Sequence, residues 1–113
     1  MIYDKANELA AMLKNSEEYK SYTELKEKAT ANETTKALIK EYHQLQFRAQ
    51  SAAMSGKRDD EAMERLKKVG EILQLNREAS EFLMAEYRMN IILSDVYKIL
   101  AEAVDVDLGA LEG

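Results

Sequence analysis

The sequence contains no cysteine, no proline and no tryptophan, and it has a single histidine, His43. Without cysteine the chain forms no disulfide, offers no thiolate to a metal or cluster, and has no cysteine nucleophile. Without proline, and with only four glycines in 113 residues, it has almost no residue that stops a helix. These absences predict an all-α protein.

The composition predicts a soluble, folded chain. Charged residues make up 33% of it and hydrophobic residues 46%, which is too apolar for intrinsic disorder and too charged for a membrane span. A chain of 113 residues suits one domain, whose modest core buries roughly two thirds of the unfolded surface. We therefore expect a single helical domain over residues 1–113.

The first residues of the chain and its net charge indicate where the protein is found in the cell and which partners it avoids. Residues 1–5 have no basic segment followed by an apolar run, so we expect no leader and a cytoplasmic protein. The net charge of -5 opposes long-range attraction to nucleic acids and anionic membranes, which are polyanions. We expect no membrane partner and no direct binding of nucleic acid.

Hydrophobic periodicity and capping residues divide the chain into about five helices. We expect them at about 2–14, 17–30, 32–54, 60–75 and 77–104, followed by a short acidic tail, 105–113. Ser16, Asn32 and Asp59 are suited to cap the second, third and fourth helices. Asn76 is the expected break before the last helix, although the fourth and fifth helices could also be continuous. The third and fourth form a long antiparallel helical hairpin.

The predicted helix lengths require an elongated bundle. A compact globule of this size has a radius of gyration of about 13 Å and is about 34 Å across. The third helix is about as long as that diameter, and the fifth is about 39 Å long. The first two helices, each about 20 Å, are too short to cover them. We therefore predict a homo-oligomer, with a dimer as the first expectation.

Apolar stripes on the third and fifth helices supply the candidate oligomer interface. Steps of three and four residues place them on one face of each helix. The candidate residues are Phe82, Ala85, Met89, Ile92, Val96 and Ile99 on the fifth helix and Leu38, Tyr42 and Leu45 on the third. Met84 and Met89, together with Phe82 and Tyr87, resemble an adaptable docking surface. Methionine at helical spacing is more often core filler, so we predict that these residues belong to the core.

The sequence contains no recognisable catalytic or metal-binding motif. His43 has no second histidine or Glu-x-x-His partner, because residue 40 is lysine, and neither glycine loops nor calcium loops are present. We therefore predict no catalytic, cofactor-binding or metal-binding residues and no cofactor. The chain is expected not to be an enzyme.

Two alternatives to a helical adaptor stay open. One is a small-ligand carrier or cryptic enzyme with a pocket inside the bundle, lined by Tyr42, His43, Gln46 or Glu86. The other is an RNA-associated protein that uses a basic cluster diluted by acids, for which a solvated surface is the favoured interpretation. The cluster consists of Lys57, Arg58, Arg65, Lys67 and Lys68.

Four segments carry a family resemblance that covers nearly the whole chain. Residues 2–9 (IYDKANEL), 16–19 (SEEY), 83–89 (LMAEYRM) and 94–99 (SDVYKI) resemble the YlbF/YmcA family of small bacterial helical proteins, in particular its YheA-like branch. The resemblance implies a cytoplasmic, non-enzymatic protein that forms complexes with other helical regulatory proteins. Characterised relatives regulate competence, sporulation and biofilm formation through a complex that influences an RNA-processing endoribonuclease. They are associated with iron-sulfur clusters held by cysteines, so this cysteine-free chain is expected to lack such a cluster.

Overall fold

A computed structural model describes residues 1–104, and these residues form five α-helices without a strand. The helices are α1 (Ile2–Lys14), α2 (Glu17–Ala29), α3 (Glu33–Met54), α4 (Asp60–Gln74) and α5 (Arg77–Ala103). Every helix end lies within one residue of the predicted position, and the all-α fold is confirmed. The predicted acidic tail, 105–113, falls outside the described residues. Within residues 1–104, none of the helices combines the length and the apolar character needed to cross a membrane.

Polar side chains fix the starts of four helices. Ser16, Asn32, Asp59 and Asn76 each accept a hydrogen bond from the backbone N–H three residues further on, at 3.0 to 3.2 Å. These bonds satisfy N–H groups that have no partner inside the helix. Asn76 thus separates α4 from α5, so the two helices are not continuous.

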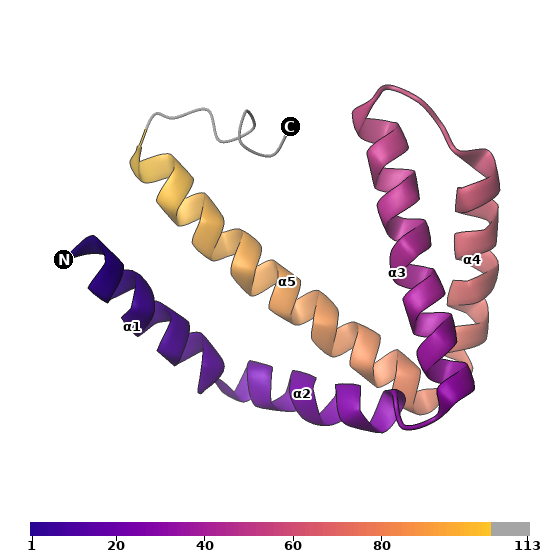
Figure 1. Cartoon of the computed structure of the whole chain (residues 1–113), viewed down its shortest axis with the longest axis horizontal. Helices are drawn as coiled ribbons and strands as arrows, with labels where there is room; N and C mark the ends of the chain where they lie inside the picture. Colours follow the sequence, from indigo (N-terminus) through magenta and orange to yellow (C-terminus); the bar gives the residue numbers. More distant parts are fainter. Residues whose placement is uncertain (105–113) are drawn as a thin grey trace.

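A glycine ends α3 and turns the chain back along it. Gly56 adopts a φ of 72°, in the left-handed region. Its N–H donates to the carbonyl of Ala53 at 3.0 Å, and the N–H of Lys57 donates to that of Ala52 at 2.8 Å. This pair of bonds is the Schellman arrangement that closes a helix. The predicted antiparallel hairpin of α3 and α4 follows (Figure 1).

The molecule has two arms that diverge from one junction (Figure 1). In the first arm α2 lies along the beginning of α5, and α1 continues beyond α2. The hairpin of α3 and α4 is the second arm. The principal extents are 46 × 37 × 16 Å and the radius of gyration is 16.8 Å, well above the value of about 13 Å for a compact chain of this length. The predicted elongation is confirmed.

The core is small and extends from the junction along the α3–α4 hairpin. Phe82, Leu73 and Val69 are the largest fully buried side chains. The other buried hydrophobic residues are Ala29 of α2, Ile39 and Leu45 of α3, Ala62 of α4, and Ala79, Ala85 and Met89 of α5. No residue of α1 is buried. The junction therefore holds the two arms together, and the hairpin is packed as far as Ala62 near the start of α4, whereas α1 packs little.

The apolar stripe of α5 is covered over only part of its length. Phe82, Ala85 and Met89 are buried, whereas Ile92 and Val96 are half-buried. Further along, the side chain of Ile99 is 67% exposed. The 13 residues of α2 span about 20 Å, and the 27 residues of α5 about 40 Å. Within one chain, α2 is therefore too short to cover the whole stripe.

Candidate protein-docking groove

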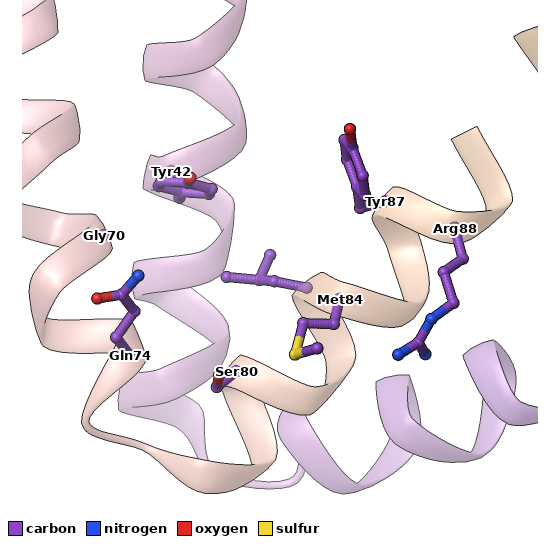
Figure 2. Close-up of a pocket in the computed structure, with 8 residues that line it drawn as sticks. Tyr42, Gly70, Gln74, Ser80, Met84, Tyr87 and Arg88 are labelled. Atoms are coloured by element: carbon purple, nitrogen blue, oxygen red, sulfur yellow. The ribbon is translucent and has the colours of Figure 1, made fainter. Parts of the chain in front are cut away.

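A hollow of 290 Å³ lies at the junction, where α3, α4 and α5 meet. Figure 2 shows side chains from all three helices around it. Its lining consists of Tyr42 from α3, Gly70 and Gln74 from α4, and Ser80, Leu83, Met84, Tyr87 and Arg88 from α5. Most of this lining is apolar, which suits the binding of an apolar side chain or helix face.

A second hollow, of 590 Å³, continues along the hairpin and shares Tyr42, Gly70 and Gln74 with the first. The remaining residues that line it are Ala49, Gln50, Ala53, Met63, Leu66, Lys67 and Glu71. We call the two hollows together the docking groove. It runs along the α3–α4 hairpin and ends against α5.

The docking groove exposes large apolar side chains to water. Met63 is 46% exposed, Met84 55% and Tyr87 67%. Met84 and Tyr87 lie three residues apart, so they share one face of α5, and both line the groove or its edge (Figure 2). The prediction that Phe82, Met84, Tyr87 and Met89 belong to the core is right for Phe82 and Met89, which are buried, and wrong for Met84 and Tyr87. Methionine and tyrosine are side chains that adapt well to a partner.

Gly70 keeps the floor of the groove open. A Cβ atom at this position would lie 3.4 Å from Cε2 of Tyr42. This distance is an ordinary van der Waals contact, so the ring of Tyr42 lies next to the backbone of α4 with room for a methyl group and no more. A larger residue in this position would occupy space that now belongs to the groove.

The nine candidate interface residues fall into three classes of burial. Phe82, Ala85, Met89 and Leu45 are buried inside the single chain, Leu38, Tyr42, Ile92 and Val96 are half-buried, and Ile99 is exposed. Of the nine, Tyr42 lines the docking groove. Their role between chains stays a prediction. What sequence reasoning missed is that Met84 and Tyr87 lie on the open side of α5.

The pocket predicted around both Tyr42 and His43 is instead two separate hollows. His43 and Glu86 line a hollow of 410 Å³ that shares no residue with the one of 290 Å³ beside Tyr42. Nε2 of His43 lies 2.7 Å from Oε1 of Glu86, which joins α3 to α5. Burial, the charge of Glu86 and then that of Tyr19 raise the pKa of Tyr22 nearby. The sequence held no signal for this pair, whose members lie 43 residues apart.

The basic cluster is largely paired with acids of the same chain. Arg65 donates two hydrogen bonds to Glu41, at 2.9 and 3.0 Å, and these bonds lower the pKa of that carboxyl group. Two further basic residues pair locally: Arg58 with Asp60 at 3.1 Å, and Lys68 with Glu64 at 3.7 Å. Such pairs leave less positive charge for RNA. Among residues 1–104, no group of three or more His, Asp or Glu side chains is arranged to hold a metal ion.

Comparison with solved structures places the fold. A protein of unknown function (DUF964) from Bacillus stearothermophilus superposes with a TM-score of 0.74 at 19% identity, over 92% of each chain. The Bacillus subtilis protein RicA, solved in complex with RicF, superposes with a TM-score of 0.59 at 21% identity, over 92% of this chain and 93% of the other. At these identities the likeness concerns the fold alone.

Comparison of sequences identifies the family. A UPF0342 protein of Halothermothrix orenii is 37% identical over 108 residues, which cover 95% of this chain and 92% of the relative. Residues 2–105 match the family described as "Control of competence regulator ComK, YlbF/YmcA". These matches extend over almost the whole length, as the resemblance of the four segments predicted. The chain therefore belongs to the YlbF/YmcA family.

Proposed function

We propose that this protein is a non-enzymatic helical adaptor of the cytoplasm, that the docking groove is its contact surface, and that its first partner is a second copy of the chain. Two comparisons support the adaptor role. The family description refers to control of a competence regulator, and RicA, which shares the fold, was solved in complex with another protein, RicF. Other helical regulatory proteins are the further class of partner that we propose.

The observation that carries the proposal is the amount of apolar surface left in water. Among residues 1–104, seventeen large hydrophobic side chains are exposed, while ten hydrophobic residues form the core. Isolated exposed hydrophobic residues are ordinary, but contiguous apolar patches mark interaction sites. The docking groove is such a patch, because Met63, Met84 and Tyr87 are exposed along one continuous depression.

A second copy supplies a helix suited to the groove. The apolar residues Ile2, Leu9 and Leu13 lie on one face of α1, yet no residue of that helix is buried in its own chain. The 13 residues of α1 are about 20 Å long. The stretch of α4 along the groove, from Met63 to Gln74, is about 17 Å long. Ile2 is 82% exposed and Leu9 and Leu13 are half-buried, so each copy offers a helix face that its own chain covers only in part, together with an open groove. This permits a symmetric exchange.

The test is the oligomeric state of matched variants, measured by light scattering and sedimentation over a range of concentrations. Met63→Lys and Met84→Lys place a charge in the groove, whereas Ile72→Lys is the control. Ile72 lies on the same helix as Met63 and is equally exposed, 47% against 46%, but it does not line the groove. Desolvating a lysine in place of a methionine should weaken the dimer at least about tenfold, and the control should leave it unchanged.

Two results would reject the assignment. A wild-type chain that stays monomeric at every concentration would show that a second copy is not the partner. A dimer that is equally sensitive to Met63→Lys and Ile72→Lys would place the interface outside the docking groove. A third variant, Leu9→Lys, tests whether α1 fills the groove. If it does, this change should weaken the dimer as much as Met63→Lys does.

A further inference from the structure

We propose that the hollow between α2, α3 and the start of α5 binds a small amphiphilic anion, which carries one carboxylate or phosphate on an apolar body. This hollow, here called the lysine hollow, has a volume of 410 Å³. It is lined by Tyr22, Lys26, Thr30, Lys36, Ile39, Lys40, His43, Gln44, Phe82 and Glu86. The proposal is independent of the docking groove, which uses other residues.

The floor of the lysine hollow is apolar. Phe82 is 1% and Ile39 4% exposed, so both belong to the core and show only their outer edges. The ring of Tyr22 is half-buried, with its centroid 5.6 Å from that of Phe82. An acyl chain or aromatic ring placed on this floor would be removed from water by residues that are already held in position.

The rim of the lysine hollow is cationic. Lys26 comes from α2, whereas Lys36 and Lys40 lie four residues apart on α3. Like charges at that spacing weaken a helix slightly. Among residues 1–104 none of the three lysines is ion-paired, although the sequence has 21 acidic residues. Unpaired cations around an apolar floor are complementary to an amphiphilic anion.

The opposing charge in the lysine hollow is small. Glu86 is the only acidic residue in the lining, and its carboxylate lies 2.7 Å from His43. That carboxylate is therefore already engaged, while the three ammonium groups keep free donors. Lys26 also lies 5.9 Å from the centroid of the Tyr22 ring. A bound anion would contact α2 and α5 of one arm and α3 of the other.

Titration with octanoate, octyl phosphate and octanol tests the proposal. His43 is the only histidine of the chain, so its ring resonances in an NMR spectrum report binding in this hollow alone. We expect both anions to shift those resonances to saturation and octanol to bind at least about tenfold more weakly, because it lacks the charge.

Substitutions locate the anion. The double variant Lys36→Gln/Lys40→Gln should weaken binding about tenfold or more, whereas Lys57→Gln/Lys98→Gln, which removes two exposed lysines that line neither the lysine hollow nor the docking groove, should not. Glu86→Gln removes the one acidic charge of the lining and keeps a hydrogen-bond partner for His43, so it should strengthen binding severalfold. That gain cannot come from misfolding, and circular dichroism would show that the lysine variants, altered at exposed positions, stay folded.

Three results would overturn the proposal. The first is the absence of saturable octanoate and octyl phosphate binding. The second is binding that leaves the His43 resonances in place or that persists in Lys36→Gln/Lys40→Gln, because the anion would then lie elsewhere. The third is sedimentation with phosphatidylglycerol vesicles that depends on these lysines while free octanoate does not bind, which would assign the cationic rim to a lipid surface.

Discussion

At the scale of single residues, Gly56 and Gly70 differ in what the missing side chain provides: a backbone conformation at Gly56 and space at Gly70. Gly56 adopts a φ of 72°, which residues with a side chain reach only at a cost, and it lies in open space. Gly70 is inside α4, where the helical backbone suits any residue, and its value lies in the room it leaves beside Tyr42. The first glycine is required by the backbone, whereas the second leaves open space beside Tyr42 that an alanine would fill with an ordinary contact.

Alanine substitutions at these glycines should change stability in opposite directions. Gly70→Ala should raise the free energy of unfolding by about 0.5–1 kcal/mol, because alanine favours a helix and the new Cβ meets the Tyr42 ring at 3.4 Å, an ordinary contact. Gly56→Ala should lower it by about 1 kcal/mol through the positive φ. Urea denaturation measures both. A loss of stability in Gly70→Ala would mean that the Tyr42 ring cannot give way.

Asp59 should make the stability depend on pH. The hydrogen bond from the Ala62 N–H, and then the contact with Arg48, lower the pKa of this carboxyl group. A carboxyl whose pKa is lower in the folded state stabilises the fold above its unfolded pKa of about 3.9 and loses that effect as the pH falls through the folded value. Asp59→Asn, which keeps a capping oxygen, should melt below wild type at neutral pH and match it in strong acid. Thermal melts over pH measure this convergence, and a difference from wild type that is the same at neutral pH and in strong acid would contradict it.

At the scale of the helix, the caps decide where elements begin, and one cap also links two arms. Asn76 accepts the N–H of Ala79 at 3.0 Å and donates from its Nδ2 to Oγ1 of Thr35 at 3.3 Å. Thr35 is a buried polar residue, 7% exposed, at the start of α3. The break between α4 and α5 thus also fixes α5 against α3. Asn32 caps α3 at the same distance, 3.0 Å, through the N–H of Thr35.

A comparison of the two asparagine caps should reveal that link. Asn32→Ala removes a cap and should cost about 1 kcal/mol. Asn76→Ala removes a cap and also takes a partner from the buried Thr35 hydroxyl, so it should cost about 1 kcal/mol more. Chemical denaturation of the two variants tests the difference. Equal losses would show that the bond between Asn76 and Thr35 adds nothing to stability.

At the scale of the whole molecule, the shape and the exposed apolar surface have one cause. Long helices that diverge from a junction leave much of their length with little cover, so the chain has extents of 46 × 37 × 16 Å and a small core at the junction and along the hairpin. Hydrophobic burial is the main favourable term in folding and association alike. A chain built in this way gains further stability when a partner covers its arms.

Small-angle scattering of a dissociated variant should report this open shape. Met84→Lys, at a concentration where light scattering shows a monomer, should give a radius of gyration no smaller than 16.8 Å. The two arms are held apart by a packed junction around Phe82 and should not close in solution. A value near 13 Å, that of a compact chain, would contradict the two-armed shape.

Local signals in the sequence were sufficient for the helices and their ends. The residues of α4 at helical spacing pack inside the chain, because Ala62, Val69 and Leu73 are buried and Leu66 is half-buried. The caps at Ser16, Asn32 and Asp59 also formed where expected. Such features depend on residues three or four apart, so they can be recognised without knowledge of the rest of the fold. Elongation followed from the helix lengths in the same way.

The candidate sites depend instead on contacts between distant parts of the chain. The sequence by itself determined an all-α, elongated chain of five helices, because helix periodicity and capping are local. Only the tertiary structure decided that Met84 and Tyr87 face the groove, that Gly70 lies under Tyr42, and that the lysines of α2 and α3 gather around Phe82. The physical reason is that the side of α5 that becomes buried depends on how much of it α2 and the hairpin cover, and helix periodicity alone does not specify this.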